Sequence, residues 1–344
     1  MNARSRKSGK MEIKLERGLL EDLIAKAGGC AVVGGGFATQ LEKHGASIND
    51  SLWSAVCLIK GPGLAKEAPI SALSVHLVYL EAGADILMTS SYQDTIPGFL
   101  SKGFSIEEGE LLLKKNVKLA VEARDEFWDD KKKLSEQGYN RAQVAASIGS
   151  YGAYLADGSE YSGHYGAEVD LDKLKDFHRR RLQVLVEAGP DLLAFETIPN
   201  KLEAQACVEL LEERHPDTIL DLFQPRGRTE RSVGGEFEEC FDAMNRSTKI
   251  SAVGINCAPP HLVEGLVHKF NQLTEKIVAI YPNRGEVWDG RAKRWLVRHC
   301  FGDEEFKSYA IRWRDAGAKL IGGSCGTTPS TIQAISNALK RVPR

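Results

Sequence analysis

The sequence predicts a single α/β domain that folds as an eight-stranded parallel barrel, the (β/α)8 or TIM-type barrel. Three observations predict it: the chain has 344 residues, short continuous apolar runs recur along it, and helical patterns separate most of these runs. A continuous apolar run is typical of a strand that is buried on both faces, as in a parallel sheet. Eight such strands alternating with helices in a chain of this length favour the barrel.

The elements are punctuated by glycines that end helices. Glu81–Asp85, Glu187–Asp191 and Asp315–Lys319 each place a glycine before an apolar run, where it suits the left-handed position that closes a helix. Clear helical patterns cover Leu111–Arg124 and Leu171–Glu187. The eight predicted strands are Ala31–Gly34, Asp85–Ser90, Gln143–Gly149, Asp191–Thr197, Thr218–Phe223, Ile250–Cys257, Lys276–Tyr281 and Lys319–Cys325.

An open, doubly wound sheet is the alternative fold, and the fifth strand is the weakest of the eight patterns. Against the open sheet, the glycines Gly34, Gly35 and Gly36 after the first strand lack the third glycine of a dinucleotide-binding turn. Residues 1–18 are basic without an apolar core, which indicates a disordered tail. Residues 19–344 then form the barrel domain.

The composition excludes several classes of partner. Hydrophobic residues make up 42% of the chain, charged residues 27%, and the net charge is −2, so no global field favours nucleic acid or an anionic membrane. No apolar run approaches the roughly 20 residues that span a bilayer. We expect a cytoplasmic protein, monomeric in preference to oligomeric. Its seven cysteines are an odd number without a secretion signal, which argues against a disulfide framework.

Polar residues gather where the predicted strands end, which is where barrel enzymes carry their chemistry. Glu196 ends the fourth strand, Cys257 the sixth and Cys325 the eighth. Two thiolates on one rim could bind zinc. On spacing alone, two unrelated buried thiols are the better explanation, because the chain has no CxxC pair. Glu196 is either a functional carboxylate or one held by backbone amides or a core arginine.

Five strings at these strand ends resemble the homocysteine S-methyltransferases, and most closely the plant-type enzymes that use S-methylmethionine. The similarity runs from about Leu20 to the C-terminus. The strings are Gly35–Glu42 (GGFATQLE), Phe195–Pro199 (FETIP), Gly254–Cys257 (GINC), Tyr281–Asn283 (YPN) and Gly322–Pro329 (GGSCGTTP).

The resemblance implies a zinc ion held by three cysteine thiolates, with the sulfur of homocysteine in the open fourth position. The zinc-bound thiolate attacks the methyl group of a sulfonium donor, either S-methylmethionine or S-adenosylmethionine. Glu196 maps to the residue near the substrate amine, and Gly35, Gly36 and Thr89 map to its carboxylate. Asn256 joins this substrate-binding set, and the resemblance implies no catalytic residue beyond the metal site.

The chain departs from the family pattern at four places. Ser324 stands where the family has a cysteine, so the ligand set becomes Cys257, Cys325 and the weaker Ser324. Gly34 replaces an aspartate, Glu67–Val75 is additional, and Asp221–Glu230 differs from the family's fifth-strand end. Because Pro69 breaks a helix interior, we expect Glu67–Val75 to be an irregular surface segment.

Three functional hypotheses remain. The chain is a homocysteine methyltransferase, or an impaired paralogue that binds homocysteine or methionine without efficient turnover, or a barrel enzyme of unrelated chemistry such as an aldolase. The third ranks last because no lysine stands at a predicted strand end. If Cys257 and Cys325 share one metal, their sulfur atoms should lie roughly 3.5–4 Å apart.

Overall fold

A parallel sheet of eight strands forms the centre of the computed structural model, which describes residues 18–46, 48, 72–131, 140–212, 218–222, 235–289, 294–296 and 299–340. The strand order is β1-β10-β7-β6-β5-β4-β3-β2. Its strands are β1 (Ala31–Val32), β2 (Ile86–Met88), β3 (Gln143–Gly149), β4 (Leu192–Ile198), β5 (Thr218–Leu222), β6 (Ile250–Asn256), β7 (Ile277–Tyr281) and β10 (Leu320–Ile321). Each of the eight predicted segments overlaps one of them, and β4 extends one residue past its predicted end, so the predicted α/β class is confirmed.

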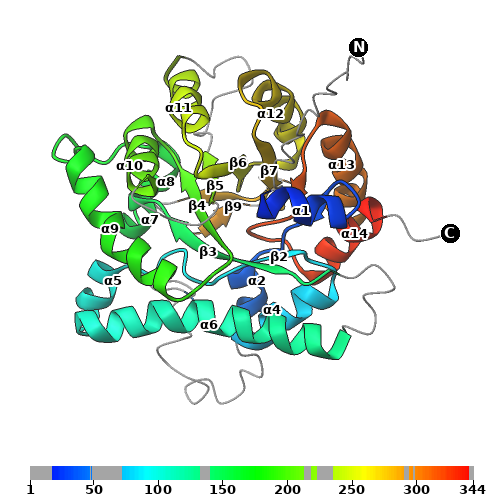
Figure 1. The fold of residues 1–344 in the computed structure, drawn as a ribbon, viewed down its shortest axis with the longest axis horizontal. Coiled ribbons are helices and arrows are strands. Elements are labelled where there is room, and N and C mark those ends of the chain that lie inside the picture. Colours follow the sequence, from blue (N-terminus) through cyan, green and yellow to red (C-terminus); the bar gives the residue numbers. More distant parts are fainter. Residues whose placement is uncertain are drawn as a thin grey trace, which may run out of the picture.

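Helices surround the sheet (Figure 1). They are α1 (Leu19–Lys26), α2 (Phe37–Lys43), α4 (Ala72–Glu81), α5 (Ile96–Ser101), α6 (Ile106–Lys131), α7 (Tyr151–Leu155), α8 (Ser159–Ser162), α9 (Leu171–Glu187), α10 (Lys201–Leu211), α11 (Gly235–Arg246), α12 (Pro260–Leu273), α13 (Asp303–Ala316) and α14 (Pro329–Leu339). The predicted helix-ending glycines Gly83, Gly189 and Gly317 have φ values of 95°, 77° and 117°, which confirms their left-handed conformation. None of the helices in the described ranges is long and apolar enough to cross a bilayer.

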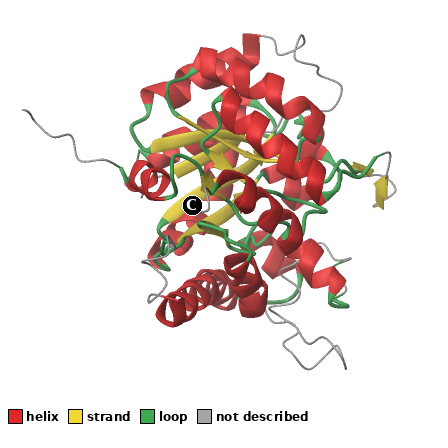
Figure 2. Cartoon of the chain, turned by 90° about the vertical axis from the view of Figure 1, so that its right-hand side faces the viewer, coloured by secondary structure: helices red, strands yellow, loops and turns green. Residues whose placement is uncertain are grey.

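A small antiparallel hairpin was not predicted. Strands β8 (Val287–Asp289) and β9 (Arg294–Leu296) pair with each other and project from the side of the molecule (Figure 2). Each has three residues, too few to give a period that distinguishes a strand from a loop.

The expectation for Glu67–Val75 was wrong at its C-terminal end. Helix α4 begins at Ala72, and Val75 is fully buried in the core between sheet and helices. Pro69 precedes this helix, and so it does not interrupt it. Residues 67–71 lie outside the described residues, as do the predicted tail up to residue 17 and residues 223–230 of the divergent Asp221–Glu230 segment.

The two faces of the sheet carry different cores. We call inner face the side that presents Ala145, Ala194, Ala252 and Ala279, which pack with Leu20 of α1. Alternate residues on the same strands point the other way, into a larger core shared with the surrounding helices. When this alternation is followed to the strand ends, the inner face carries polar side chains at the C-terminal rim of the sheet.

Strands β1 and β2 stand at opposite ends of the strand order, and hydrogen bonds nevertheless link them. Val33 forms an isolated parallel bridge with Ile86, and the Gly34 amide donates to the Ile86 carbonyl at 2.9 Å. The Asp85 carboxylate, 2% exposed, accepts from the Val32 amide at 2.8 Å. Lys340, beyond the end of α14, lies 3.0 Å from the other oxygen of this carboxylate. The start of β2 is thus tied both to β1 and to the last helix.

Arg181 of α9 joins the loop after β2 to the end of β3 by hydrogen bonds. Its side chain is 1% exposed, and its guanidinium donates to the carbonyls of Gly149 at 3.0 Å, Ser91 at 2.7 Å and Tyr92 at 2.6 Å. Burial lowers the pKa of Arg181 to about 10, so the group stays charged at neutral pH. One side chain therefore fixes the loop after β2 against the end of β3.

Replacing Arg181 with methionine should destabilise the fold by about 3 kcal/mol or more, because three buried carbonyls lose a charged donor. The neighbouring Arg180→Met is the matched control, since Arg180 is 52% exposed and makes only a surface ion pair with Glu110. We expect that change to stay within about 0.5 kcal/mol of the parent. Urea unfolding measures both, and equal losses would show that Arg181 has no special structural role.

Candidate active site

Cys257 and Cys325 meet at the C-terminal rim of the sheet. Their sulfur atoms lie 3.9 Å apart, which confirms the proximity expected from the sequence. Cys257 follows β6 in the left-handed region with φ 51°, and Thr197 at the end of β4 shares this conformation with φ 58°. Such backbone strain costs about 1 kcal/mol or more per residue and collects at functional sites. The Cys257 carbonyl accepts from Asn283, which holds this turn in place.

The two thiols differ in acidity. The hydrogen bond from the Cys325 thiol lowers the pKa of Cys257, and burial opposes that shift. The same hydrogen bond, with burial, raises the pKa of Cys325 well above its ordinary value. The hydrogen bond between the two sulfur atoms therefore acts on the two pKa values in opposite directions.

Ser324 lies beside this pair on a fixed backbone. Its amide donates to the Pro282 carbonyl at 2.9 Å, and its carbonyl accepts from the Thr327 hydroxyl at 2.7 Å. The Ser324 hydroxyl is buried and makes no hydrogen bond of ordinary geometry with the described residues. It lowers the pKa of Cys257 less than the Cys325 thiol does. Within the described ranges, no group of three or more His, Cys, Asp or Glu side chains is placed to hold a metal ion. This agrees with a hydroxyl standing where a third thiolate would be.

Glu196 lies on the inner face at the end of β4. It is 7% exposed, and Ser147 of β3 donates a hydrogen bond to it. Burial raises the pKa of Glu196 to about 7, and the Ser147 hydrogen bond and the Arg181 charge oppose the shift. At neutral pH this carboxyl is poised between its two protonation states, so a cationic ligand would favour ionisation.

Asn256 is the last residue of β6 and directly precedes Cys257 at the rim. Its amide nitrogen donates to the Thr197 hydroxyl at 2.8 Å across the top of the sheet. Its amide oxygen is buried and has no hydrogen-bond partner among the residues that the structure describes. A buried acceptor of this kind is ready for a donor from a ligand.

The predicted glycines Gly35 and Gly36 lie where the loop after β1 meets the loop after β10. A Cβ on Gly35 would lie 2.8 Å from the Tyr79 ring, and one on Gly36 would lie 2.6 Å from the Ser324 carbonyl. The Gly36 amide already donates to the Thr327 hydroxyl at 3.1 Å. These glycines therefore permit close packing beside Ser324, and their contact with a substrate stays a prediction.

Thr89 is buried at the end of β2 and is engaged by protein atoms. Its hydroxyl accepts from the Ser147 amide at 2.9 Å and bonds the Ser91 hydroxyl at 2.7 Å. Its predicted role at the substrate carboxylate is not tested by this arrangement. Ser147 itself was missed by the sequence analysis, although its position two residues before Gly149 places it on the same face as Glu196.

Two tyrosines and a second carboxylate surround the cysteines. Burial raises the pKa values of Tyr92 and Tyr161 well above the ordinary range, and the charges of Glu160 and Cys257 act on both in the same direction. Glu160 and Tyr161 belong to α8, which packs on the end of β4. The surroundings of the cysteine pair are therefore aromatic and negatively charged.

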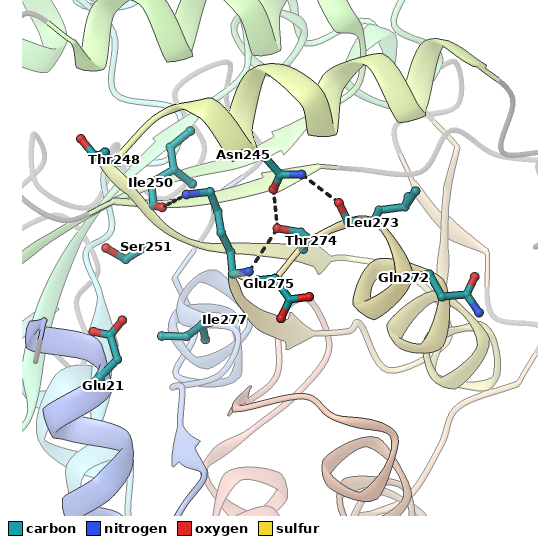
Figure 3. A pocket seen from close by; sticks show the side chains of 11 residues that line it. Glu21, Asn245, Thr248, Ile250, Ser251, Gln272, Leu273, Thr274, Glu275 and Ile277 are labelled. Atoms are coloured by element: carbon teal, nitrogen blue, oxygen red, sulfur yellow. Dashed lines mark hydrogen bonds between the residues drawn. The ribbon is translucent and has the colours of Figure 1, made fainter.

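A hollow of about 620 Å³ lies at the opposite end of the sheet, where β6 and β7 begin (Figure 3). Some of its polar groups are used locally: Lys276 donates to the carbonyls of Ile250 at 2.6 Å and Ser247 at 2.8 Å, and Thr274 donates to Asn245. Because the strand-end chemistry lies at the other rim, this hollow is not the candidate active site.

The fold and the rim identify the class to which the chain belongs. It matches the Homocysteine S-methyltransferase family over residues 31–339 and therefore belongs to that family. Homocysteine S-methyltransferase 1 of Arabidopsis thaliana is 67% identical over 332 residues, which cover 96% of this chain and 100% of that protein. The resemblance to the plant-type enzymes is thus confirmed.

Two further relatives widen the comparison. Selenocysteine Se-methyltransferase of Brassica oleracea var. italica is 49% identical over 329 residues, covering 93% of this chain and 92% of that protein. The metallated form of the homocysteine methyltransferase MmuM from Escherichia coli is 34% identical with a TM-score of 0.75, covering 89% of this chain and 95% of that one.

The packing at Gly36 can be tested against its neighbour. Gly36→Ala should destabilise the protein by about 1–3 kcal/mol, because its Cβ meets a backbone carbonyl that cannot move aside. Gly34→Ala is the control, since the nearest atom to its Cβ lies 3.6 Å away. Thermal unfolding compares the two variants, and a Gly36→Ala protein as stable as its control would contradict the packing argument.

The raised pKa of Glu196 predicts a pH-dependent affinity for methionine. The ionised carboxylate binds an ammonium group, so affinity should rise as pH increases through about 7 and fall below it. Methionine suits the test because its carboxylate titrates well below neutral pH and the ammonium group of a free amino acid titrates well above it. Glu196→Gln should weaken binding by about 1.5–3 kcal/mol at pH 8 and flatten the profile. Calorimetry measures both, and an unchanged profile would remove Glu196 from the site.

Proposed function

We propose that the protein transfers a methyl group from a sulfonium donor to homocysteine and so forms methionine. The observation that carries the proposal is the pair of thiols 3.9 Å apart on the same rim as a buried carboxylate. Membership of the Homocysteine S-methyltransferase family supports it. S-methylmethionine and S-adenosylmethionine both fit this chemistry, because each carries a methyl group on a positively charged sulfur.

We propose zinc as the metal, held by Cys257 and Cys325 with Ser324 beside them. The donor set fits in part: two soft sulfur ligands lie at the spacing of a shared ion, and the buried hydroxyl of Ser324 beside them offers a weaker third ligand. When bound, the metal supplies a positive charge that keeps the homocysteine sulfur deprotonated. The relative MmuM is known in a metallated form, which supports a metal in this family.

The protein's own residues orient the two substrates. Glu196 and the Asn256 oxygen accept hydrogen bonds from the amino group of homocysteine, which fixes its sulfur toward the cysteines. Glu160 and the tyrosine rings attract the positive sulfur of the donor. As the methyl group moves from donor sulfur to homocysteine sulfur, the donor leaves as a neutral thioether. No side chain therefore needs to act as a general acid at the methyl group.

We also propose that the sheet closes on itself as the (β/α)8 barrel expected from the sequence. The bridge between Val33 and Ile86 and the hydrogen bonds across β1 and β2 support closure. A cytoplasmic location and a monomeric state stay predictions of the sequence.

Ser324→Cys tests the metal proposal directly. The fixed backbone of residue 324 should present a third thiolate, so the affinity for zinc should rise by orders of magnitude and the zinc content should approach one equivalent per chain. Methionine formation from homocysteine should rise with them. Ser330→Cys is the matched control, because it adds a thiol at an exposed position on α14 and should change neither.

Three outcomes separate the alternatives. A parent protein with a full zinc equivalent and rapid turnover shows that another group completes the ligand set beside Ser324. A variant that gains zinc without turnover shows that the substrate pocket is impaired. A variant that gains neither would reject the metal proposal for this chain.

A further inference from the structure

Glu203, in the first turn of α10, is a buried carboxylate with three partners. Its side chain is fully buried. One oxygen accepts a hydrogen bond from the Tyr151 amide at 2.6 Å and lies 2.8 Å from Nε2 of His178. The other oxygen accepts a hydrogen bond from the Tyr165 hydroxyl. Because a buried carboxylate is costly unless hydrogen bonds compensate it, these contacts hold their partners firmly in place.

Two of the three partners belong to the segment between β3 and α9. Tyr151 begins α7 and Tyr165 follows α8, so Glu203 holds this segment on both sides of α8. Asn200, the N-cap of α10, adds a further link, because its amide nitrogen donates to the carbonyl of Gly163 at 3.0 Å. Gly163 is the residue directly after α8. The segment is therefore fastened to the start of α10 before and after its short helix.

Helix α8 carries side chains that lie near the cysteine pair. Burial, followed by the charges of Cys257 and Cys325, raises the pKa of Tyr161 well above its ordinary range, which places the two sulfur atoms near this ring. Glu160 is the residue before it, and α8 packs on the end of β4. A helix of four residues is not stable by itself. The position of α8 therefore depends on the contacts that fasten its two ends.

We propose that Glu203 is a positioning residue, which holds α8 against the cysteine pair so that this helix favours a positively charged sulfur. A sulfonium group is attracted to a carboxylate and to the faces of aromatic rings, whereas a neutral thioether lacks this attraction. A displaced α8 therefore changes the affinity for a sulfonium more than the affinity for a thioether. This inference rests on the proposed function, since that function supplies the sulfonium donor.

Calorimetry with S-methylmethionine and methionine tests this assignment, because the two amino acids differ by one methyl group and its positive charge. Glu203→Gln keeps the shape of the side chain and removes its charge, so its hydrogen bonds to the segment weaken. We expect S-methylmethionine to bind about tenfold more weakly, and methionine to change less than about threefold. A role in stability alone would weaken both ligands equally.

Glu209→Gln is the matched control. Glu209 also lies on α10 and also meets α9, where it pairs with Lys175 at 2.7 Å. Among the described residues its side chain bonds Lys175 and Gln205, both outside the segment that carries α8. This variant should bind both ligands as the parent protein does. Tyr165→Phe is a second, milder variant that removes one of the three contacts of Glu203, and we expect about a threefold loss for S-methylmethionine alone.

Equal loss of both ligands in Glu203→Gln, or unchanged binding of S-methylmethionine, would overturn the assignment. If Glu203→Gln does not fold, the same two results for Tyr165→Phe decide it. A parent protein that binds both ligands but forms no methionine from homocysteine would overturn the proposed function, and the binding comparison would still decide the role of Glu203.

Discussion

The pairing of β1 with β10 is the contact on which the rest of the site depends. Ala31 lies opposite Leu320, although nearly the whole chain separates them. This register sets the loop after the first strand against the loop after the last, and the Gly323 amide reaches the Gly34 carbonyl at 3.2 Å. Because β10 also pairs with β7, the same register carries Cys325 to the neighbourhood of Cys257. Small residues at this junction allow the two backbones to approach.

Burial raises the pKa values of both Glu196 and Cys257, but at Cys257 the hydrogen bond within the cysteine pair outweighs burial and the pKa falls. The rim therefore combines a thiol whose pKa is lowered with a carboxyl whose pKa is raised. Several buried polar atoms there have no partner, including the Asn256 oxygen and the hydroxyls of Tyr281 and Ser324. Arg181 and the strained turns at Thr197 and Cys257 hold these atoms in place without a ligand.

Much of this arrangement could be predicted from the sequence because its signals are local. Gly83, Gly189 and Gly317 end helices directly before strands, and strand-end positions alone singled out Glu196, Cys257 and Cys325. What escaped prediction depends on long-range packing. In the sequence, Tyr281 belongs to an apolar run. The structure places it on the inner face, where its hydroxyl has no hydrogen-bond partner among the described residues. Thr89 was expected to contact a substrate at a strand end, yet its hydroxyl accepts a hydrogen bond from the Ser147 amide of the next strand. Val75 followed a proline and was taken as surface, because sequence alone does not show where α4 begins.

The link between Asp85 and Lys340 has a consequence for biosynthesis. The two residues are 255 positions apart, so the carboxylate at the start of β2 waits for its cation until almost the whole chain has been made. At synthesis rates of about 5–20 residues per second, this delay lasts roughly ten seconds to a minute. During that time β1 also lacks its partner β10, and its unpaired edge is open to association with other chains. The β1–β10 pairing and the link between Asp85 and Lys340 therefore form late in synthesis, and a chaperone is most useful to the chain before they form.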